Sequence, residues 1–251
     1  NEDNLVEQAT VDILAGIGWG IKTAWHNETF GKDGLLGRDN KSEVILFKFL
    51  IPALKELNPD LPKQAYESAC LQIAQKEAGK TLGRTNKEKY ELIKDGVKVS
   101  FTDDEGELVR KKLKVFDFNT PENNHFLAVR QLEVTGELYN RRTDVVGFVN
   151  GIPLVFFELK AHHRDLRQAY DDNLKDYKDT IPHLLHTNAF VILSNGIDFR
   201  DNIGTKIGTI TSPYKFFHEW KRIDEGTEGV VSLDTTIRGT CSKHNLIDLF
   251  E

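Results

Sequence analysis

A stretch near the middle of the chain, residues 143–160, constrains the fold more than any other. Two apolar runs, 145–149 and 152–157, flank the dipeptide Asn150-Gly151. Asn-Gly between two runs rich in β-branched and aromatic residues is the strongest short-range signal for a β-hairpin. The second run is apolar almost without interruption, which is typical of a strand buried on both faces. The sequence therefore predicts a hairpin in the interior of a sheet.

Charged residues lie at the open end of this hairpin. Asp144 precedes the first strand, and Glu158 and Lys160 end the second. Counting outward from the turn, Asp144 lies opposite Phe157 or Glu158, depending on the register. Side chains alternate along a strand, so Glu158 and Lys160 share a face. We therefore expect two carboxylates and one ammonium group to converge.

Such a convergence has two interpretations. Two neighbouring carboxylates repel each other, and their pKa values rise unless a cation neutralises them. A hard divalent cation with oxygen ligands is the natural neutraliser, and Lys160 could then stabilise negative charge that develops on water or phosphate. The alternative is a solvated strand end that carries an ordinary surface salt bridge.

The composition limits the class of protein. The chain has 251 residues, 39% of them hydrophobic and 29% charged, as expected for one soluble globular unit or for a domain with a subdomain. It contains no apolar run of membrane-spanning length and nothing that resembles a signal peptide, so we expect a cytoplasmic protein without membrane contact. The net charge of −6 argues against DNA binding that relies on the overall charge of the chain. The local pair Arg141-Arg142 could still contact phosphates, or it could belong to a solvated face.

The periodicity along the chain predicts the order of the elements. Helices are expected at residues 2–15, 164–180, 214–221 and 243–251, and strands at 97–102, 108–118, 126–134, 189–193 and 206–211. Residues 41–94 read as a helical block. This order indicates an α/β fold with a mixed central β-sheet flanked by helices and with a helical insert at about 41–94.

The pattern Asp144, hairpin, Glu158-Leu159-Lys160 is that of PD-(D/E)xK nucleases. The wider segments 116–160, 173–200 and 207–221 resemble the N-terminal nuclease domain of the R (restriction, motor) subunit of type I restriction-modification enzymes. The resemblance extends over nearly the whole chain. A lone Asp and Glu-x-Lys would be a weak signal, but the motif together with its surroundings is specific. The fold that this resemblance implies is restriction-endonuclease-like.

The resemblance also implies a metal site. Asp144 and Glu158 would bind Mg²⁺, and the Leu159 carbonyl would be a further ligand. Lys160 would orient or activate the attacking water. Glu7, in the first helix ahead of a Gly-aromatic pair, is a fourth candidate ligand, although by itself it reads as a solvated helix residue.

The helix after Lys160 often carries Gln-x-x-x-Tyr in this family. Here Tyr177 is present, but the residue four positions before it is Asn173. Asn173 keeps the amide on a shorter side chain, so the pair is expected to support the site or contact DNA, as are Arg141 and Arg142. The alternative for Tyr177 is an ordinary amphipathic-helix residue packed on the sheet.

The resemblance finally implies a division of labour. Residues 1–215 would form the nuclease domain, and 216–251 would connect it to a helicase motor. The chain contains no G-x-x-x-x-G-K-[ST] phosphate loop, so ATP would be bound only in the motor region of the full-length subunit. The domain would cleave double-stranded DNA without sequence preference of its own, in a complex with methyltransferase and specificity subunits.

Two other functions remain open on the sequence alone. One is another nuclease of the same fold, such as a repair exonuclease or a junction resolvase. The other is a catalytically silent module that positions DNA or docks another subunit.

Overall fold

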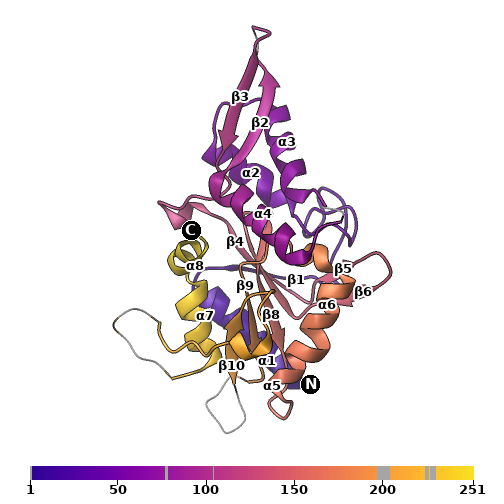
Figure 1. Cartoon of the computed structure of the whole chain (residues 1–251), viewed down its shortest axis with the longest axis vertical. Coiled ribbons are helices and arrows are strands. Elements are labelled where there is room, and N and C mark those ends of the chain that lie inside the picture. Colours follow the sequence, from indigo (N-terminus) through magenta and orange to yellow (C-terminus); the bar gives the residue numbers. More distant parts are fainter. Residues whose placement is uncertain (1, 77–78, 104, 197–203, 224–225, 227–229) are drawn as a thin grey trace.

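A six-stranded sheet forms the centre of the computed structural model (Figure 1). The structure describes the whole chain except residues 1, 77–78, 104, 197–203, 224–225 and 227–229, so the end of the segment 173–200 lies outside the described residues. The strands, in spatial order, are β1 (Gly20–Thr23), β4 (Phe126–Arg130), β7 (Val145–Val149), β8 (Ile152–Leu159), β9 (Phe190–Ser194) and β10 (Thr205–Gly208).

The sheet is mixed, as expected. β1 runs parallel to β4 and β8 runs parallel to β9, whereas the pairs β4–β7, β7–β8 and β9–β10 are antiparallel. The α/β prediction with helices on both sides is confirmed. β1 was not predicted, because Gly-Ile-Lys-Thr shows too short an alternation to be distinguished from a loop.

The two faces of the sheet carry different cores. One face packs against α1 (Glu2–Gly16), α7 (Leu233–Cys241) and α8 (Lys243–Phe250), and it includes Phe157. The other packs against a continuous helical segment made of α5 (Leu166–Gln168), η2 (Ala169–Leu174) and α6 (Lys175–Thr180), and it includes Phe156. Adjacent residues of β8 therefore enter opposite cores, which explains why residues 152–157 are apolar at every position.

The predicted helical insert projects from the sheet (Figure 1). It consists of α2 (Phe47–Leu57), α3 (Lys63–Ala74) and α4 (Leu82–Asp95), followed by the hairpin of β2 (Val97–Thr102) and β3 (Leu108–Leu113). The first helix begins at Phe47 rather than at residue 41, because Asn40 Oδ1 accepts hydrogen bonds from the Ser42 amide and hydroxyl and thereby holds a turn. Pro52 lies inside α2 without ending it.

The predicted central hairpin is confirmed. Asn150 and Gly151 have φ angles of 49° and 78°, the positive pair that a type I′ turn requires. The turn is not exposed. Asn150 is fully buried, its amide donates to the Val115 carbonyl at 2.9 Å, and its Oδ1 accepts from the His125 N–H at 2.7 Å. The side chain that permits the turn thus also anchors it in the interior.

A β-bulge decides the register of the hairpin. Val149 pairs with Ile152 next to the turn, but the pairing shifts by one residue between Gly147 and Phe148, so that Val145 pairs with Phe157. Continued by one position, this register sets Asp144 opposite Glu158. Without the bulge, Asp144 would stand opposite Phe157, and its side chain would share a face with an apolar residue.

The C-terminal part differs from the prediction. The helix expected at 214–221 is wrong, because only the short 3₁₀ turn η4 (Tyr214–Phe216) forms before His218 pairs with Ile207. Helix α7 was not predicted, whereas the final helix was. The Trp19 indole N–H donates to the Cys241 carbonyl at 2.8 Å, so α7 belongs to the same core as the N-terminal helix. The division of the chain at residue 216 remains a prediction.

Three short elements complete the framework. They are η1 (Pro121–Asn123), η3 (Pro182–Leu185) and the hairpin of β5 (Glu133–Thr135) and β6 (Asn140–Arg142). In the described part of the chain, no helix is both long enough and apolar enough to cross a membrane.

Candidate active site at the open end of the hairpin

Glu158, near the end of β8, is the most constrained charged residue of the site. Its exposed fraction is only 1%. Its Oε1 accepts from the Lys160 ammonium at 3.0 Å, whereas Oε2 is buried and has no hydrogen-bond partner among the described residues. A buried carboxylate oxygen without a partner is costly, so this atom indicates an incomplete set of ligands.

The surroundings raise the pKa of Glu158 well above its usual value. Burial is the largest cause and the negative charge of Asp144 is the second, while Lys160 and Tyr177 act in the opposite direction. Burial penalises the charged form, and the second carboxylate adds repulsion. The site therefore favours a neutral Glu158 until a cation approaches.

Asp144 is held against the end of β8 by the backbone. The Leu159 N–H donates to Asp144 Oδ2 at 2.6 Å, and the Gln131 N–H donates to the Asp144 carbonyl at 2.8 Å. The Lys160 N–H donates to the Ser194 carbonyl at 2.8 Å, which extends the pairing with β9 past the last residue of β8. The structure thus brings together Asp144, Glu158 and Lys160.

This donor set suits a hard cation that keeps much of its water. Mg²⁺ typically binds through one or two protein carboxylates and retains several water ligands. Asp144 and Glu158 would provide that pair, and Glu158 Oε2 is the orphaned atom that a cation would satisfy. Within the described residues, no group of three or more His, Cys, Asp and Glu side chains could hold a metal ion. The Leu159 carbonyl remains a predicted ligand.

Glu7 lies near the site but is engaged elsewhere. Its Oε2 accepts from Arg130 Nε at 2.8 Å and from the Gln131 side-chain amide at 2.9 Å. Since the Gln131 backbone N–H donates to the main-chain carbonyl of Asp144, one residue connects the Glu7 carboxylate to the backbone of Asp144. However, α1 covers the face of the sheet opposite to Phe156 and Tyr177. The role of Glu7 as a metal ligand stays a prediction.

Gln131 is a site residue that the sequence did not reveal. Its φ is 54°, in the left-handed region that non-glycine residues rarely adopt. This conformation lets its backbone bond to Asp144 while its side chain bonds to Glu7. A glutamine after a strand gives no recognisable signal for such a role.

The helical segment after Lys160 presents Tyr177 to the site. Its hydroxyl donates to the Arg142 carbonyl at 3.3 Å, and its ring meets Phe156 edge to face at 5.4 Å. Burial, Glu158 and Asp144 raise the pKa of Tyr177, and a hydrogen bond with Asn173 opposes the rise. Asn173 lies in η2, a π-helical turn of the kind that often occurs at functional sites. The predicted Asn173–Tyr177 pair therefore forms beside the carboxylates.

The two arginines before Asp144 differ. Arg141 forms an ion pair with Asp176, with Nη2 to Oδ1 at 2.7 Å, which raises the pKa of Arg141. Arg142 is exposed and lies over the Trp25 ring at 4.3 Å. Arg142 is thus the better placed of the two to meet a phosphate.

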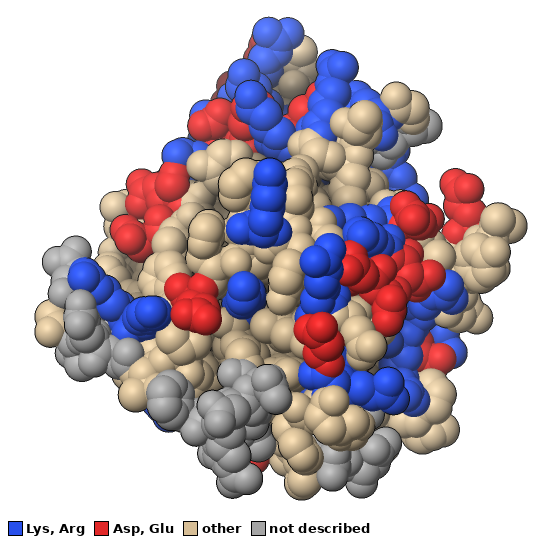
Figure 2. Space-filling view, turned by 60° about the horizontal axis from the view of Figure 1, so that its bottom comes forward, with Lys and Arg blue, Asp and Glu red and all other residues tan. Residues whose placement is uncertain are grey.

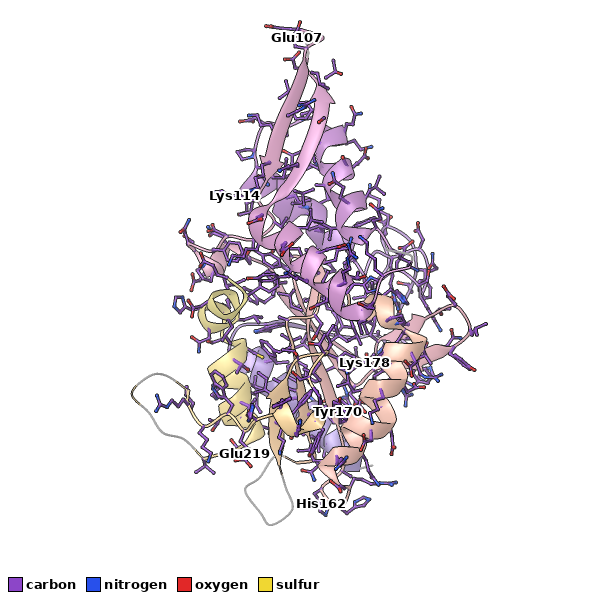
Figure 3. The ribbon with its side chains drawn as sticks, in the orientation of Figure 1. Glu107, Lys114, His162, Tyr170, Lys178 and Glu219 are labelled. Atoms are coloured by element: carbon purple, nitrogen blue, oxygen red, sulfur yellow. The ribbon has the colours of Figure 1, made fainter. Side chains whose placement is uncertain are left out.

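The site occupies one end of a long molecule. Figure 3 shows His162, which closely follows Lys160, at the end opposite Glu107 in the hairpin of β2 and β3. Figure 2 shows the corresponding face, where acidic and basic side chains are interspersed rather than separated into one large basic patch. This mixture of charges on the visible face agrees with the modest net charge of the chain.

Comparison with known proteins gives a consistent result. A family model described as "Type I restriction enzyme R protein N terminus" matches residues 1–205. The type I restriction enzyme HindI endonuclease subunit of Haemophilus influenzae is 33% identical over 260 residues, which cover 98% of this chain and 23% of that protein. A protein of Methanocaldococcus jannaschii, provisionally named type I restriction enzyme MjaIXP endonuclease subunit, is 28% identical over 280 residues, covering 100% of this chain and 25% of that protein.

A shorter match concerns the type I restriction enzyme SsaAORF53P endonuclease subunit of Staphylococcus saprophyticus, which is 33% identical over 94 residues. The chain spans about a quarter of the length of the two relatives that it matches throughout. Because the family model covers most of the chain, and its residues include the whole Asp144–Lys160 site, this chain belongs to the family of type I restriction enzyme R protein N termini.

Proposed function

We propose that this chain is a Mg²⁺-dependent endonuclease domain that cleaves phosphodiester bonds of double-stranded DNA. The observation that carries the proposal is the buried Oε2 of Glu158, beside Asp144 and Lys160, for which the described residues provide no hydrogen-bond partner. The names of the relatives, which describe endonuclease subunits of type I restriction enzymes, support the same activity.

The residues divide the work as follows. When bound between Asp144 and Glu158, Mg²⁺ would supply Lewis-acid stabilisation of the phosphate charge. Lys160, whose side chain is 21% exposed, would hold and orient the attacking water. Tyr177 would fix the position of Glu158 from the helix side, because it interacts with that carboxylate, and Asn173 would hold Tyr177 through their hydrogen bond.

DNA recognition would be divided between this domain and other subunits. Contacts to phosphate position a protein on DNA, whereas contacts to bases specify the sequence. The site region offers exposed Arg142 for phosphate contact but, on its mixed-charge face, no continuous basic track in view (Figure 2). The domain would therefore cut without sequence preference, within a complex that also contains methyltransferase and specificity subunits.

Calorimetric titration with Mg²⁺ and Mn²⁺ tests the metal site directly. The wild-type chain should bind weakly, and Asp144→Ala should lose binding by at least about tenfold, equivalent to 1.4 kcal/mol. Asp171→Ala is the matched control, since Asp171 lies on the nearby helix and pairs with Arg167 and Lys175. Equal binding by the wild type and Asp144→Ala would remove the metal from this site and would favour a silent docking module.

The raised pKa of Glu158 sharpens the test. Because the metal must displace a proton from Glu158, binding should release protons and strengthen as the pH rises, by up to about tenfold per pH unit. Titrations in two buffers of different ionisation enthalpy measure the protons released. Binding that is independent of pH between 5 and 8 would contradict the assignment of Glu158 as a ligand.

A further inference from the structure

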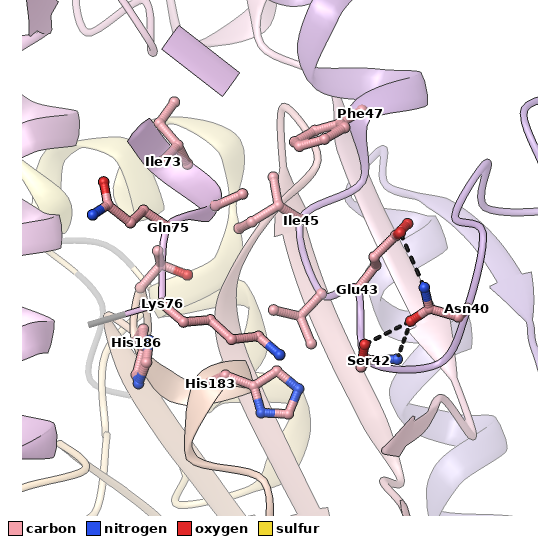
Figure 4. A pocket seen from close by; sticks show the side chains of 13 residues that line it. Asn40, Ser42, Glu43, Ile45, Phe47, Ile73, Gln75, Lys76, His183 and His186 are labelled. Atoms are coloured by element: carbon pink, nitrogen blue, oxygen red, sulfur yellow. Dashed lines mark hydrogen bonds between the residues drawn. The ribbon is translucent and has the colours of Figure 1, made fainter. Parts of the chain in front are cut away.

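A second region contains polar groups that the proposed nuclease does not use. A cavity of about 180 Å³ lies between the helical insert and the segment after α6 (Figure 4). Val44, Ile45, Phe47 and Ile73 form much of its apolar wall. It adjoins a wider groove of about 830 Å³, with which it shares Ser42, Lys76, His183 and His186. None of these residues belongs to the carboxylate site.

His183 is the central residue of this cavity. It is buried, with an exposed fraction of 9%, and its Nε2 has no hydrogen-bond partner among the described residues. Burial, Lys76 and His186 lower the pKa of His183 to about 4, against a weaker effect of a hydrogen bond to the Ser42 backbone. Since Nε2 has no partner there, Nδ1 makes the hydrogen bond to the Ser42 backbone. This bond raises the pKa of the ring, which means that the Nδ1–H of His183 donates it. His183 is therefore neutral, with a bare acceptor at Nε2.

A cation accompanies this acceptor. Figure 4 shows the Lys76 side chain extending toward the His183 ring from the end of α3. Lys76 is exposed and has no ion-pair partner within the described ranges. The carboxylate in the wall is engaged by its own loop, because Glu43 accepts from the Asn40 amide at 3.2 Å and from the Asp39 N–H at 2.9 Å. The cavity thus offers a ligand the ammonium group of Lys76 and the neutral acceptor of His183.

We propose that this cavity binds a phosphate monoester or inorganic phosphate. The ligand must be an anion to meet Lys76, and it must carry a hydrogen-bond donor to meet His183 Nε2. A phosphate monoester has its second pKa near 6, so at neutral pH it is charged and still presents an O–H in part of its population. Sulfate and the phosphodiester of intact DNA carry charge without such a proton. A metal cation is disfavoured by the ammonium group of Lys76.

The proposal is independent of the nuclease activity. Free phosphate, a mononucleotide and the 5′-phosphate of a DNA strand end all present the required group. The cavity draws its walls from residues 40–47, from the end of α3 and from residues 183–187. A bound phosphate would therefore connect the helical insert to the sheet domain through one ligand.

Calorimetry with inorganic phosphate in the presence of EDTA tests the proposal on the 251-residue chain. The wild type should bind phosphate at least about tenfold more tightly than sulfate. Lys76→Gln and His183→Phe should each weaken phosphate binding by tenfold or more. Lys63→Gln is the matched control, because Lys63 is a largely exposed lysine at the other end of α3. Lys76 is exposed, so its substitution does not threaten folding even if that of the buried His183 does.

Three results would overturn the proposal: no phosphate binding by the wild type, equal binding of sulfate, or equal affinities of Lys76→Gln and Lys63→Gln. Asp144→Ala should bind phosphate as tightly as the wild type, and a loss in that variant would place the anion at the carboxylate site instead. Titration with dAMP and with duplexes that carry 5′-phosphate or 5′-hydroxyl ends then distinguishes a small ligand from a strand end.

Discussion

Two of the buried side-chain atoms that lack a hydrogen-bond partner in the described part of the chain, Glu158 Oε2 and His183 Nε2, lie in different parts of this molecule. Each belongs to a side chain whose neutral form is favoured by burial, and each has a lysine nearby. Their remaining neighbours differ. Glu158 faces a second carboxylate, Asp144, whereas His183 faces the cationic Lys76 and the imidazole of His186.

The difference shows that desolvation alone does not select a ligand. Burial moves both groups to the neutral state, as it does for any ionisable side chain. The fixed charge next to each group decides what can restore its hydrogen bonding. A second negative charge beside Glu158 favours a cation, while a positive charge beside His183 favours an anion that carries a proton. We therefore expect the two regions to respond in opposite directions to the same change, such as a change of pH.

The largest expected effect concerns Lys160. Under the proposed function, Lys160→Ala in an assembled restriction enzyme should lower the rate of DNA cleavage by about 10² to 10⁴-fold, the usual range for a group that assists proton transfer. Mg²⁺ binding and DNA-stimulated ATP hydrolysis should persist, since neither requires this ammonium group. Cleavage and ATPase assays on the same preparation check this. Loss of both activities would indicate a folding defect and would separate Lys160 from the chemistry.

The next effect concerns acid stability at His183. Its folded-state pKa is lowered to about 4 from an ordinary value of 6.5, so the unfolded chain binds the extra proton. This group's contribution to stability should be complete above pH 6.5 and should fall by about 3 kcal/mol as the pH drops to 4. Urea unfolding of the wild type and His183→Phe between pH 7.5 and 4 measures it. Parallel pH profiles in the two proteins would contradict the prediction.

The stability that Glu158 contributes should depend on pH in the opposite direction. Its folded-state pKa is raised, so the stability that it contributes is present below an ordinary glutamate pKa of 4.5 and is lost as the pH rises. In EDTA at pH 7.5, Glu158→Gln should therefore melt a few degrees higher than the wild type, since about 1 kcal/mol corresponds to roughly 2–4 °C at this size. The gain should vanish near pH 4. A variant that melts lower at pH 7.5 would mean that the Lys160 contact outweighs the burial cost.

The smallest effect concerns Arg142. If Arg142 contacts one phosphate, Arg142→Gln should reduce the salt dependence of DNA binding by about one unit in the logarithmic slope. The recognised site should not change, because a phosphate contact carries no sequence information. Binding measured over a range of salt concentrations, with exposed Lys87→Gln as control, tests this. Any change in which duplex is preferred would assign Arg142 to base contact.

The carboxylate site could be predicted because its geometry is local. Asp144 and Glu158 lie on two strands joined by a two-residue turn, so the hairpin alone brings them together. The sequence left two registers open, and only the bulge at Gly147 and Phe148 decides between them. Tertiary packing also restricts the residue at this bulge, because a Cβ at Gly147 would lie 2.9 Å from the Trp19 ring.

The cavity around His183 could not be predicted. Its polar groups come from segments far apart in the sequence, and no spacing rule connects residues 42, 76 and 183. Helix α7 was missed for a related reason. Thr235, Thr236 and Thr240 are buried there, and the hydroxyls of Thr236 and Thr240 donate to carbonyls one turn back, so tertiary packing overrides a weak helical pattern.

The bulge in the central hairpin also bears on how such chains are classified. Insertion of one residue into β8 between the bulge and Phe157 would leave the Asp, Glu and Lys identities untouched, and the apolar runs would remain readable. With the bulge kept, however, the pairing would set Asp144 against Phe157 instead of Glu158. A comparison that scores only the presence of the three motif residues would count that chain as an intact nuclease. The number of residues between the two carboxylates is therefore as much a part of the signature as the identities of the three motif residues.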